Sequence, residues 1–93
     1  GLLNTMGRHA EAKVDLTRAI ELNPRFAEAY YNRGVANRHL GMYEEAIADF
    51  GKATEIDPRL AVAFYNLASV YSLVGEHGLA EIAKKRAALL GMR

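Results

Sequence analysis

Glu11–Phe26 reads EAKVDLTRAIELNPRF, and Glu45–Leu60 reads EAIADFGKATEIDPRL, so two closely similar stretches lie 34 residues apart. The residues that follow also recur, because Ala27–Asn32 (AEAYYN) returns as Ala61–Asn66 (AVAFYN). A fixed period of this length is typical of solenoids, in which each unit packs only against its neighbours. The sequence therefore predicts a repeat architecture, and such an architecture favours binding over catalysis.

Proline and glycine mark the ends of the predicted helices. Pro24 and Pro58 each end a run of apolar residues at helical spacing, and proline cannot continue a helix. Gly7, Gly41 and Gly75 recur at the same 34-residue offset, and glycine is the usual left-handed residue just past a helix end. Each unit is therefore predicted as helix, glycine turn, helix, proline turn. The expected helices are 9–22, 27–40, 43–56, 61–74 and 77–90, preceded by a stub of an earlier helix at 1–6.

The composition excludes several classes of protein. With 51% hydrophobic and 25% charged residues, the chain has the balance of a folded protein and not of a disordered one. The net charge of +1 provides no overall field to attract nucleic acid or anionic lipid, so neither partner is expected. Cysteine is absent, no apolar run approaches the roughly 20 residues of a membrane span, and no signal peptide is visible. A soluble intracellular protein is the default expectation.

The residue types within each unit narrow the fold further. The second unit carries Tyr30, Gly34, Ala46, Phe50, Ala53 and Pro58. The third carries Phe64, Leu67, Ala68, Tyr71, Ala80 and Ala87, and the first keeps Ala12, Leu16, Ala19 and Pro24. With these residues the chain resembles the tetratricopeptide-repeat (TPR) family over essentially its whole length.

The resemblance implies an all-α, right-handed solenoid of antiparallel helix pairs, about two and two-thirds repeats long. All 93 residues would form one domain, with a truncated repeat at 1–26, a complete repeat at 27–60 and a last repeat at 61–93. The small residues of the pattern would let paired helices approach closely, and Tyr30, Phe50, Phe64 and Leu67 would fill the core.

Four residues depart from the family pattern, and one of them is Met92, which stands where Pro24 and Pro58 predict a proline. Arg33 stands where leucine is usual and Asn37 where tyrosine is usual, so this helix is predicted to have a more polar inner surface. Lys84 replaces the aromatic residue that Phe50 provides one unit earlier. A terminal repeat needs a polar outer face, which makes Lys84 a sign that the last repeat closes the array. The alternative is a mid-array unit with an individual substitution.

A binding surface is expected on the first helices of the units, which line the concave wall in the family. Tyr-Asn occurs at the same place in two units, and an asparagine amide can pair with a peptide backbone as donor and as acceptor. Similar family members use asparagines in this way. The alternative is that these amides serve the fold, and that Arg38 and His39 are simply solvated. The predicted peptide-binding residues are Glu28, Tyr31, Asn32, Val35, Arg38, His39, Val62, Tyr65, Asn66, Ser69, Ser72 and Leu73.

Nothing in the sequence favours catalysis, a cofactor or a metal. Of the three histidines, His9, His39 and His77, the repeat equivalents His9 and His77 are two units apart and should lie far from each other. Neither a metal-binding histidine spacing nor a catalytic triad can be recognised. The leading interpretation is a peptide- or protein-binding adaptor. A self-assembling scaffold that stacks repeats end to end is the first alternative, and a non-catalytic targeting arm of a larger enzyme is the second.

The first residues predict an unpaired edge. Gly1–Met6 matches only the tail of a leading helix, so helix 9–22 would lack most of its partner and expose apolar residues. We therefore expect a fragment of a longer protein that self-associates through this N-terminal edge.

Overall fold

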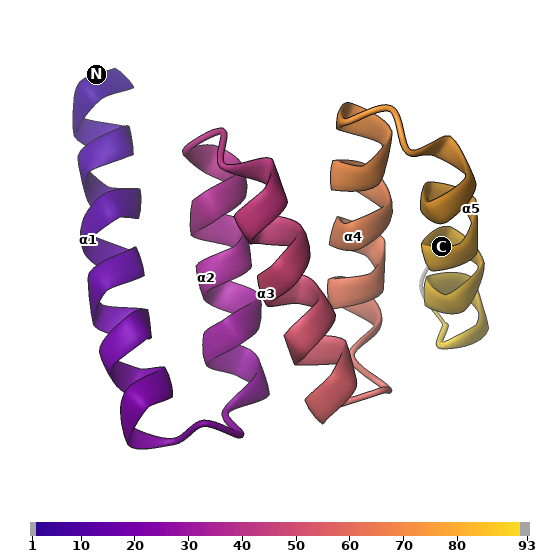
Figure 1. The fold of residues 1–93 in the computed structure, drawn as a ribbon, viewed down its shortest axis with the longest axis horizontal. Coiled ribbons are helices and arrows are strands. Elements are labelled where there is room, and N and C mark those ends of the chain that lie inside the picture. Colours follow the sequence, from indigo (N-terminus) through magenta and orange to yellow (C-terminus); the bar gives the residue numbers. More distant parts are fainter. Residues whose placement is uncertain (1, 92–93) are drawn as a thin grey trace.

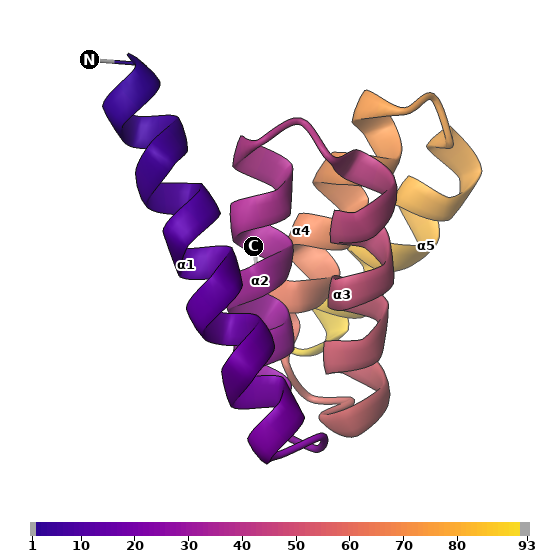
Figure 2. The same cartoon turned by 60° about the vertical axis from the view of Figure 1, so that its left-hand side comes forward.

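A computed structural model describes residues 2–91, and their side chains from Met6 onward, so Met92 lies outside the described residues. This part of the chain forms five helices: α1 (Leu2–Leu22), α2 (Ala27–His39), α3 (Tyr43–Ile56), α4 (Ala61–Leu73) and α5 (His77–Leu89). Successive helices run antiparallel and lie side by side in chain order, with α1 and α5 at the two ends (Figures 1 and 2). Each helix packs against its neighbours in the chain, and α2 also touches α4. The predicted all-α stack of antiparallel helix pairs is thus confirmed.

Two of the predicted glycine turns form as expected. Gly41 and Gly75 have φ values of 77° and 83°, in the left-handed region that glycine enters without a Cβ penalty. After α2, the Met42 N–H donates to the Asn37 carbonyl at 2.8 Å, which is the long hydrogen bond of a Schellman cap. The same bond recurs one unit later. These caps end α2 and α4 and turn the chain back into α3 and α5.

The two proline turns are also built alike. After α1, the Asn23 carbonyl accepts a hydrogen bond from the Phe26 N–H at 3.1 Å, which closes a tight turn around Pro24. The Asn23 side-chain oxygen accepts a second bond from the Arg25 N–H at 3.2 Å. Asp57 makes the equivalent pair of bonds one unit later. The acidic or amide residue before each proline therefore fixes the turn.

The predicted break at Gly7 is wrong. Helix α1 runs without interruption from Leu2 to Leu22, so the expected stub at 1–6 and the expected helix at 9–22 are one element. Gly7 is not among the glycines with positive φ. The turns at Gly41 and Gly75 bring α3 onto α2 and α5 onto α4, and this helix packing stabilises the reversal of chain direction. Glycine permits a turn but does not impose one, and it stays helical at a cost of about 1 kcal/mol relative to alanine.

Replacing Gly7 by alanine should therefore strengthen α1. No atom lies within 4 Å of a Cβ added at this position, so the expected gain is the helix propensity, about 0.5–1 kcal/mol less any fraying near the helix end. Gly41→Ala is the control and should destabilise by about 1 kcal/mol, because its φ of 77° disfavours a side chain. Circular dichroism with urea unfolding measures both. Lower helicity in Gly7→Ala would mean that a turn forms there.

The core lies between the helix pairs. Phe50 has no exposed surface, and it clusters with Ala46, Leu67, Ala68 and Val70. The small residues that the sequence assigned to close helix contacts are buried: Gly34, Ala46, Ala53, Ala68, Ala80 and Ala87.

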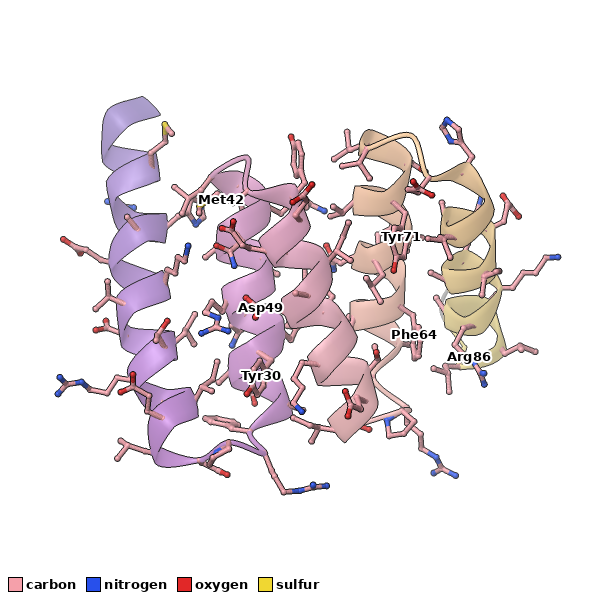
Figure 3. All side chains as sticks on the ribbon, viewed as in Figure 1. Tyr30, Met42, Asp49, Phe64, Tyr71 and Arg86 are labelled. Atoms are coloured by element: carbon pink, nitrogen blue, oxygen red, sulfur yellow. The ribbon has the colours of Figure 1, made fainter. Side chains whose placement is uncertain are left out.

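Tyr30 and Phe64 are less buried than expected. Both are only partly buried, and Phe64 packs against the core cluster whereas Tyr30 does not belong to it. The guanidinium of Arg33 lies 5.6 Å from the Tyr30 ring centre, and that of Arg86 lies 6.0 Å from the Phe64 ring centre. Figure 3 shows Arg86 near Phe64. Each ring is therefore partly covered by the rest of the protein and has an arginine guanidinium beside it.

Candidate functional site

The residues predicted on α2 fall into two groups. Tyr31 and Val35 are partly buried and pack against the core cluster, with the Tyr31 ring centre 5.6 Å from that of Phe50. Arg38 is also partly buried and reaches across to α4. These three side chains therefore lie at the contact between α2 and α4.

The other α2 residues of the predicted set are on the surface. Glu28, Asn32 and His39 are exposed, and they follow one another along one side of the helix. The side chain of Asn32 makes no hydrogen bond to another described residue. Its amide is thus open to solvent as both donor and acceptor.

Asn66 has a different environment from its repeat equivalent Asn32. Its Nδ2 donates to the Tyr31 hydroxyl at 3.1 Å and to the Val62 carbonyl at 2.9 Å. Its Oδ1 accepts a hydrogen bond from Nη1 of Arg38 at 2.9 Å. Both amide hydrogens of Asn66 are therefore used within the fold. The Tyr31 hydroxyl, which accepts here, keeps its own hydrogen for donation to another group.

Four other predicted residues of α4 lie beside α5, and Val62 is partly buried. Tyr65, Ser69, Ser72 and Leu73 line a groove of about 450 Å³ between α4 and α5. We call it the α4/α5 groove. Its other lining residues are Ala68, Ala80, Glu81 and Lys84. The predicted set thus divides between the surface along α2 and α4 and this groove at the end of the stack.

A buried polar cluster joins three helices beneath the α2 surface. Asp49 on α3 points toward α2 (Figure 3) and accepts hydrogen bonds from Nε and Nη2 of Arg33 at 2.9 and 2.7 Å. Asp49 also accepts a bond from Nδ2 of Asn37 at 2.9 Å, and Nη1 of Arg33 donates to the Thr17 hydroxyl of α1 at 3.2 Å. The hydrogen bond to Asp49 raises the pKa of Arg33 above its ordinary value, although burial opposes this. The forked ion pair holds α2 and α3 in register, and the separate hydrogen bond to Thr17 links α1 to them.

From Arg33 and Asn37 we predicted a polar inner surface on this helix, and the cluster shows what makes it polar. The sequence analysis did not identify Asp49 as the partner of these two residues. A comparison of the repeat units does contain a signal that Asp49 interacts with Arg33 and Asn37. The positions 34 residues after Arg33, Asn37 and Asp49 hold Leu67, Tyr71 and Ala83. All three polar residues are thus lost together in the next unit, as expected if they interact.

Two histidines that are distant in the sequence meet between α1 and α2. The rings of His9 and His39 are stacked, with centres 4.4 Å apart and planes within 8°. Although His39 is largely exposed, the burial of the remaining part of its side chain lowers its pKa, and the neighbouring His9 and Arg38 lower it further. Within the described residues no group of three or more metal-binding side chains forms. The stacked pair is a contact between α1 and α2.

None of the helices between residues 2 and 91 has the length and hydropathy needed to cross a bilayer.

Comparison with known protein families gives two matches. A model described as "Tetratricopeptide repeat" matches residues 27–60, and a second, described as "TPR repeat", matches residues 3–41. A search of curated proteins found no significant match.

Similar solved structures share the same stack of helices. "Crystal structure of MamA" is 30% identical, with a TM-score of 0.89, and the match covers 94% of this chain and 51% of that one. "Crystal structure of YrrB: a TPR protein with an unusual peptide-binding site" is 31% identical, with a TM-score of 0.85, and covers 96% and 46%. A MamA RS-1 double mutant, 24% identical, shares the fold with a TM-score of 0.87 over 96% and 49% of the two chains. The chain spans about half the length of each.

Proposed function

Because the chain belongs to the tetratricopeptide-repeat family, whose members typically bind proteins and lack catalytic activity, we propose that it binds an extended peptide segment of a partner protein along α2 and α4. It would serve there as an adaptor or scaffold. The observation that carries the proposal is the exposed amide of Asn32 beside the fixed network of Tyr31, Asn66 and Arg38. YrrB, described as having a peptide-binding site, is 31% identical to this chain, which supports the same class of ligand.

The chemistry of this surface suits a peptide main chain. The Asn32 amide can donate to a peptide carbonyl and accept from a peptide N–H at the same time. Asn66 is held by three hydrogen bonds before any ligand arrives, so Tyr31 and Arg38 lose little side-chain freedom on binding. The Tyr31 hydroxyl hydrogen and the remaining N–H groups of Arg38 are donors for ligand carbonyl or carboxylate oxygens.

The charged residues of this surface differ between the two ends of α2. Glu28 lies near the start of α2, whereas Arg38 and His39 lie in its last turn. An acidic residue of the ligand is therefore expected near the Arg38 end, and a basic or neutral residue near Glu28. This arrangement favours one orientation of a bound peptide over its reverse.

The proposal is tested by selecting peptides from a random displayed library on the wild-type chain and measuring their affinity by calorimetry. Asn32→Ala should weaken binding about tenfold, because it removes two hydrogen bonds to the ligand at about 0.5–1.5 kcal/mol each. Glu44→Ala is the matched control, since Glu44 is also exposed but lies on α3. Both variants should keep wild-type helicity.

Asn66→Ala provides a second comparison. It should weaken binding and also lower the free energy of unfolding by about 1 kcal/mol, because it removes an intramolecular network. Selected peptides that bind Asn32→Ala as tightly as the wild type would contradict the proposal.

A further inference from the structure

The α4/α5 groove is the repeat equivalent of a groove that is already filled. Each residue lining it stands 34 positions after a residue of α2 or α3. In that earlier unit, Ala46 and Phe50 form the core cluster with Leu67 and Ala68 of α4. Helix α4 therefore occupies the position between α2 and α3 that the open groove offers between α4 and α5. The internal repeat thus indicates that the shape which fits this groove is an α-helix.

The same equivalence gives the occupant its direction. Helix α4 runs parallel to α2 and antiparallel to α3 (Figure 1). A helix in the α4/α5 groove is accordingly expected to run parallel to α4 and antiparallel to α5.

The groove differs in chemistry from the one that α4 fills. Lys84 and Glu81 stand where Phe50 and Ile47 stand one unit earlier. An aromatic ring would not fit in the same way at Lys84. Phe50 packs so closely on Gly34 that an added Cβ would lie 2.8 Å from its ring, and Ala68 carries that Cβ in the third unit. The occupant must therefore match one acidic and one basic residue three positions apart.

Helix α1 of this chain carries the matching pattern on its outer face. It packs on α2, its residue Ile20 is buried, and the face opposite Ile20 is exposed. Asp15 and Arg18 are exposed there, also three positions apart and in the order acid then base. In an antiparallel pairing with α5, Asp15 comes opposite Lys84 and Arg18 opposite Glu81.

Apolar contacts extend this pairing. Val14 is 68% exposed beside the charged pair on α1 and can face the floor of the groove. One turn beyond Arg18, Leu22 is 82% exposed, and in the same register it approaches the end of α4, where Leu73 is 59% exposed. Burial of these side chains provides the driving force, and the charges select the register.

We propose that the outer face of α1 docks into the α4/α5 groove of a second copy of this chain. The two surfaces lie at opposite ends of the stack, so the contact is heterologous and each added copy presents a new groove. The product is a head-to-tail array. This inference goes beyond the peptide-binding function and does not depend on it.

The test is the size of the 93-residue chain by sedimentation velocity, from micromolar into the millimolar range. The wild type is expected to associate with rising concentration. Lys84→Glu should weaken association at least about tenfold, because Asp15 would then face an acidic residue in place of a basic one. Lys85→Glu is the matched control: it makes the same charge change on the next residue, which does not line the groove, and should have little effect.

Charge reversal on the other side completes the test. Asp15→Lys alone should weaken association as Lys84→Glu does, and the two substitutions together should restore it to within about threefold of the wild type. Circular dichroism establishes that each variant keeps its helicity. A wild-type chain that stays monomeric throughout, a Lys85→Glu effect equal to that of Lys84→Glu, or a double variant that does not recover would each overturn the proposal.

Discussion

Replacing Asp49 by alanine is expected to destabilise the fold by about 2–3 kcal/mol. Removal of one partner of a buried ion pair typically costs about 3–5 kcal/mol, since it leaves an uncompensated charge. The lower figure applies here because the Arg33 side chain keeps 22% of its surface exposed and can reach water. The change also removes the partner of the Asn37 amide, whose side-chain oxygen already finds no partner among the described residues.

The third unit of the chain supplies a replacement for the whole polar cluster. Leu67, Tyr71 and Ala83 stand at its equivalent positions. The triple change Arg33→Leu, Asn37→Tyr and Asp49→Ala should therefore recover most of the stability lost in Asp49→Ala. Buried ion pairs can often be exchanged for apolar residues of similar volume without loss.

Urea unfolding of the single and triple variants measures this recovery. A strongly non-additive series is expected, because the three residues share one network. A triple variant less stable than Asp49→Ala alone would show that the cluster is not equivalent to the apolar contact of the next unit.

The second large effect is expected at the contact between Phe50 and Gly34. Phe50→Ala should cost about 3–5 kcal/mol, because the ring is fully buried and its loss leaves a cavity. Gly34→Ala in the wild type should cost about 1 kcal/mol. Its Cβ would lie 2.8 Å from two ring atoms of Phe50, and this overpacking outweighs the gain in helix propensity.

The two changes together should reverse the sign of the Gly34 effect. Without the Phe50 ring, Gly34→Ala meets no clash and should stabilise by up to about 1 kcal/mol. Gly51→Ala on α3 is the matched control, since a Cβ there has no atom within 4 Å, and it should be mildly stabilising in both backgrounds. A Gly34→Ala change that destabilises equally with and without Phe50 would contradict the close contact.

The repeat made most of the fold predictable. Each turn signal except Gly7 is followed by a second helix that packs back on the first, and the residues around Pro24 and Pro58 even form the same hydrogen bonds. The helices α2 to α5 lie within one residue of their predicted ends. The prediction of a turn at Gly7 was wrong because a turn is stabilised by packing between the two helices that it joins. That packing is a property of the tertiary structure and not of the glycine.

The placement of the proposed binding residues was less predictable for a geometric reason. Neighbouring residues on a helix point about 100° apart, so Tyr31 faces α4 while Asn32 faces solvent, although both were assigned to one stripe. Pairs such as Asp49 with Arg33, or His9 with His39, depend on how two helices are aligned. A single sequence contains no direct signal for that alignment, except where the units change together, as they do at the polar cluster.

Mapping a selected peptide onto the chain by NMR tests the proposed binding surface most directly. Titration into the ¹⁵N-labelled chain should shift the side-chain amide resonances of Asn32 and Asn66 and the backbone resonances of α2, with little change at Ala80 and Lys84. Shifts centred on Ala80 and Lys84, with Asn32 unaffected, would place the peptide in the α4/α5 groove and contradict the proposed surface.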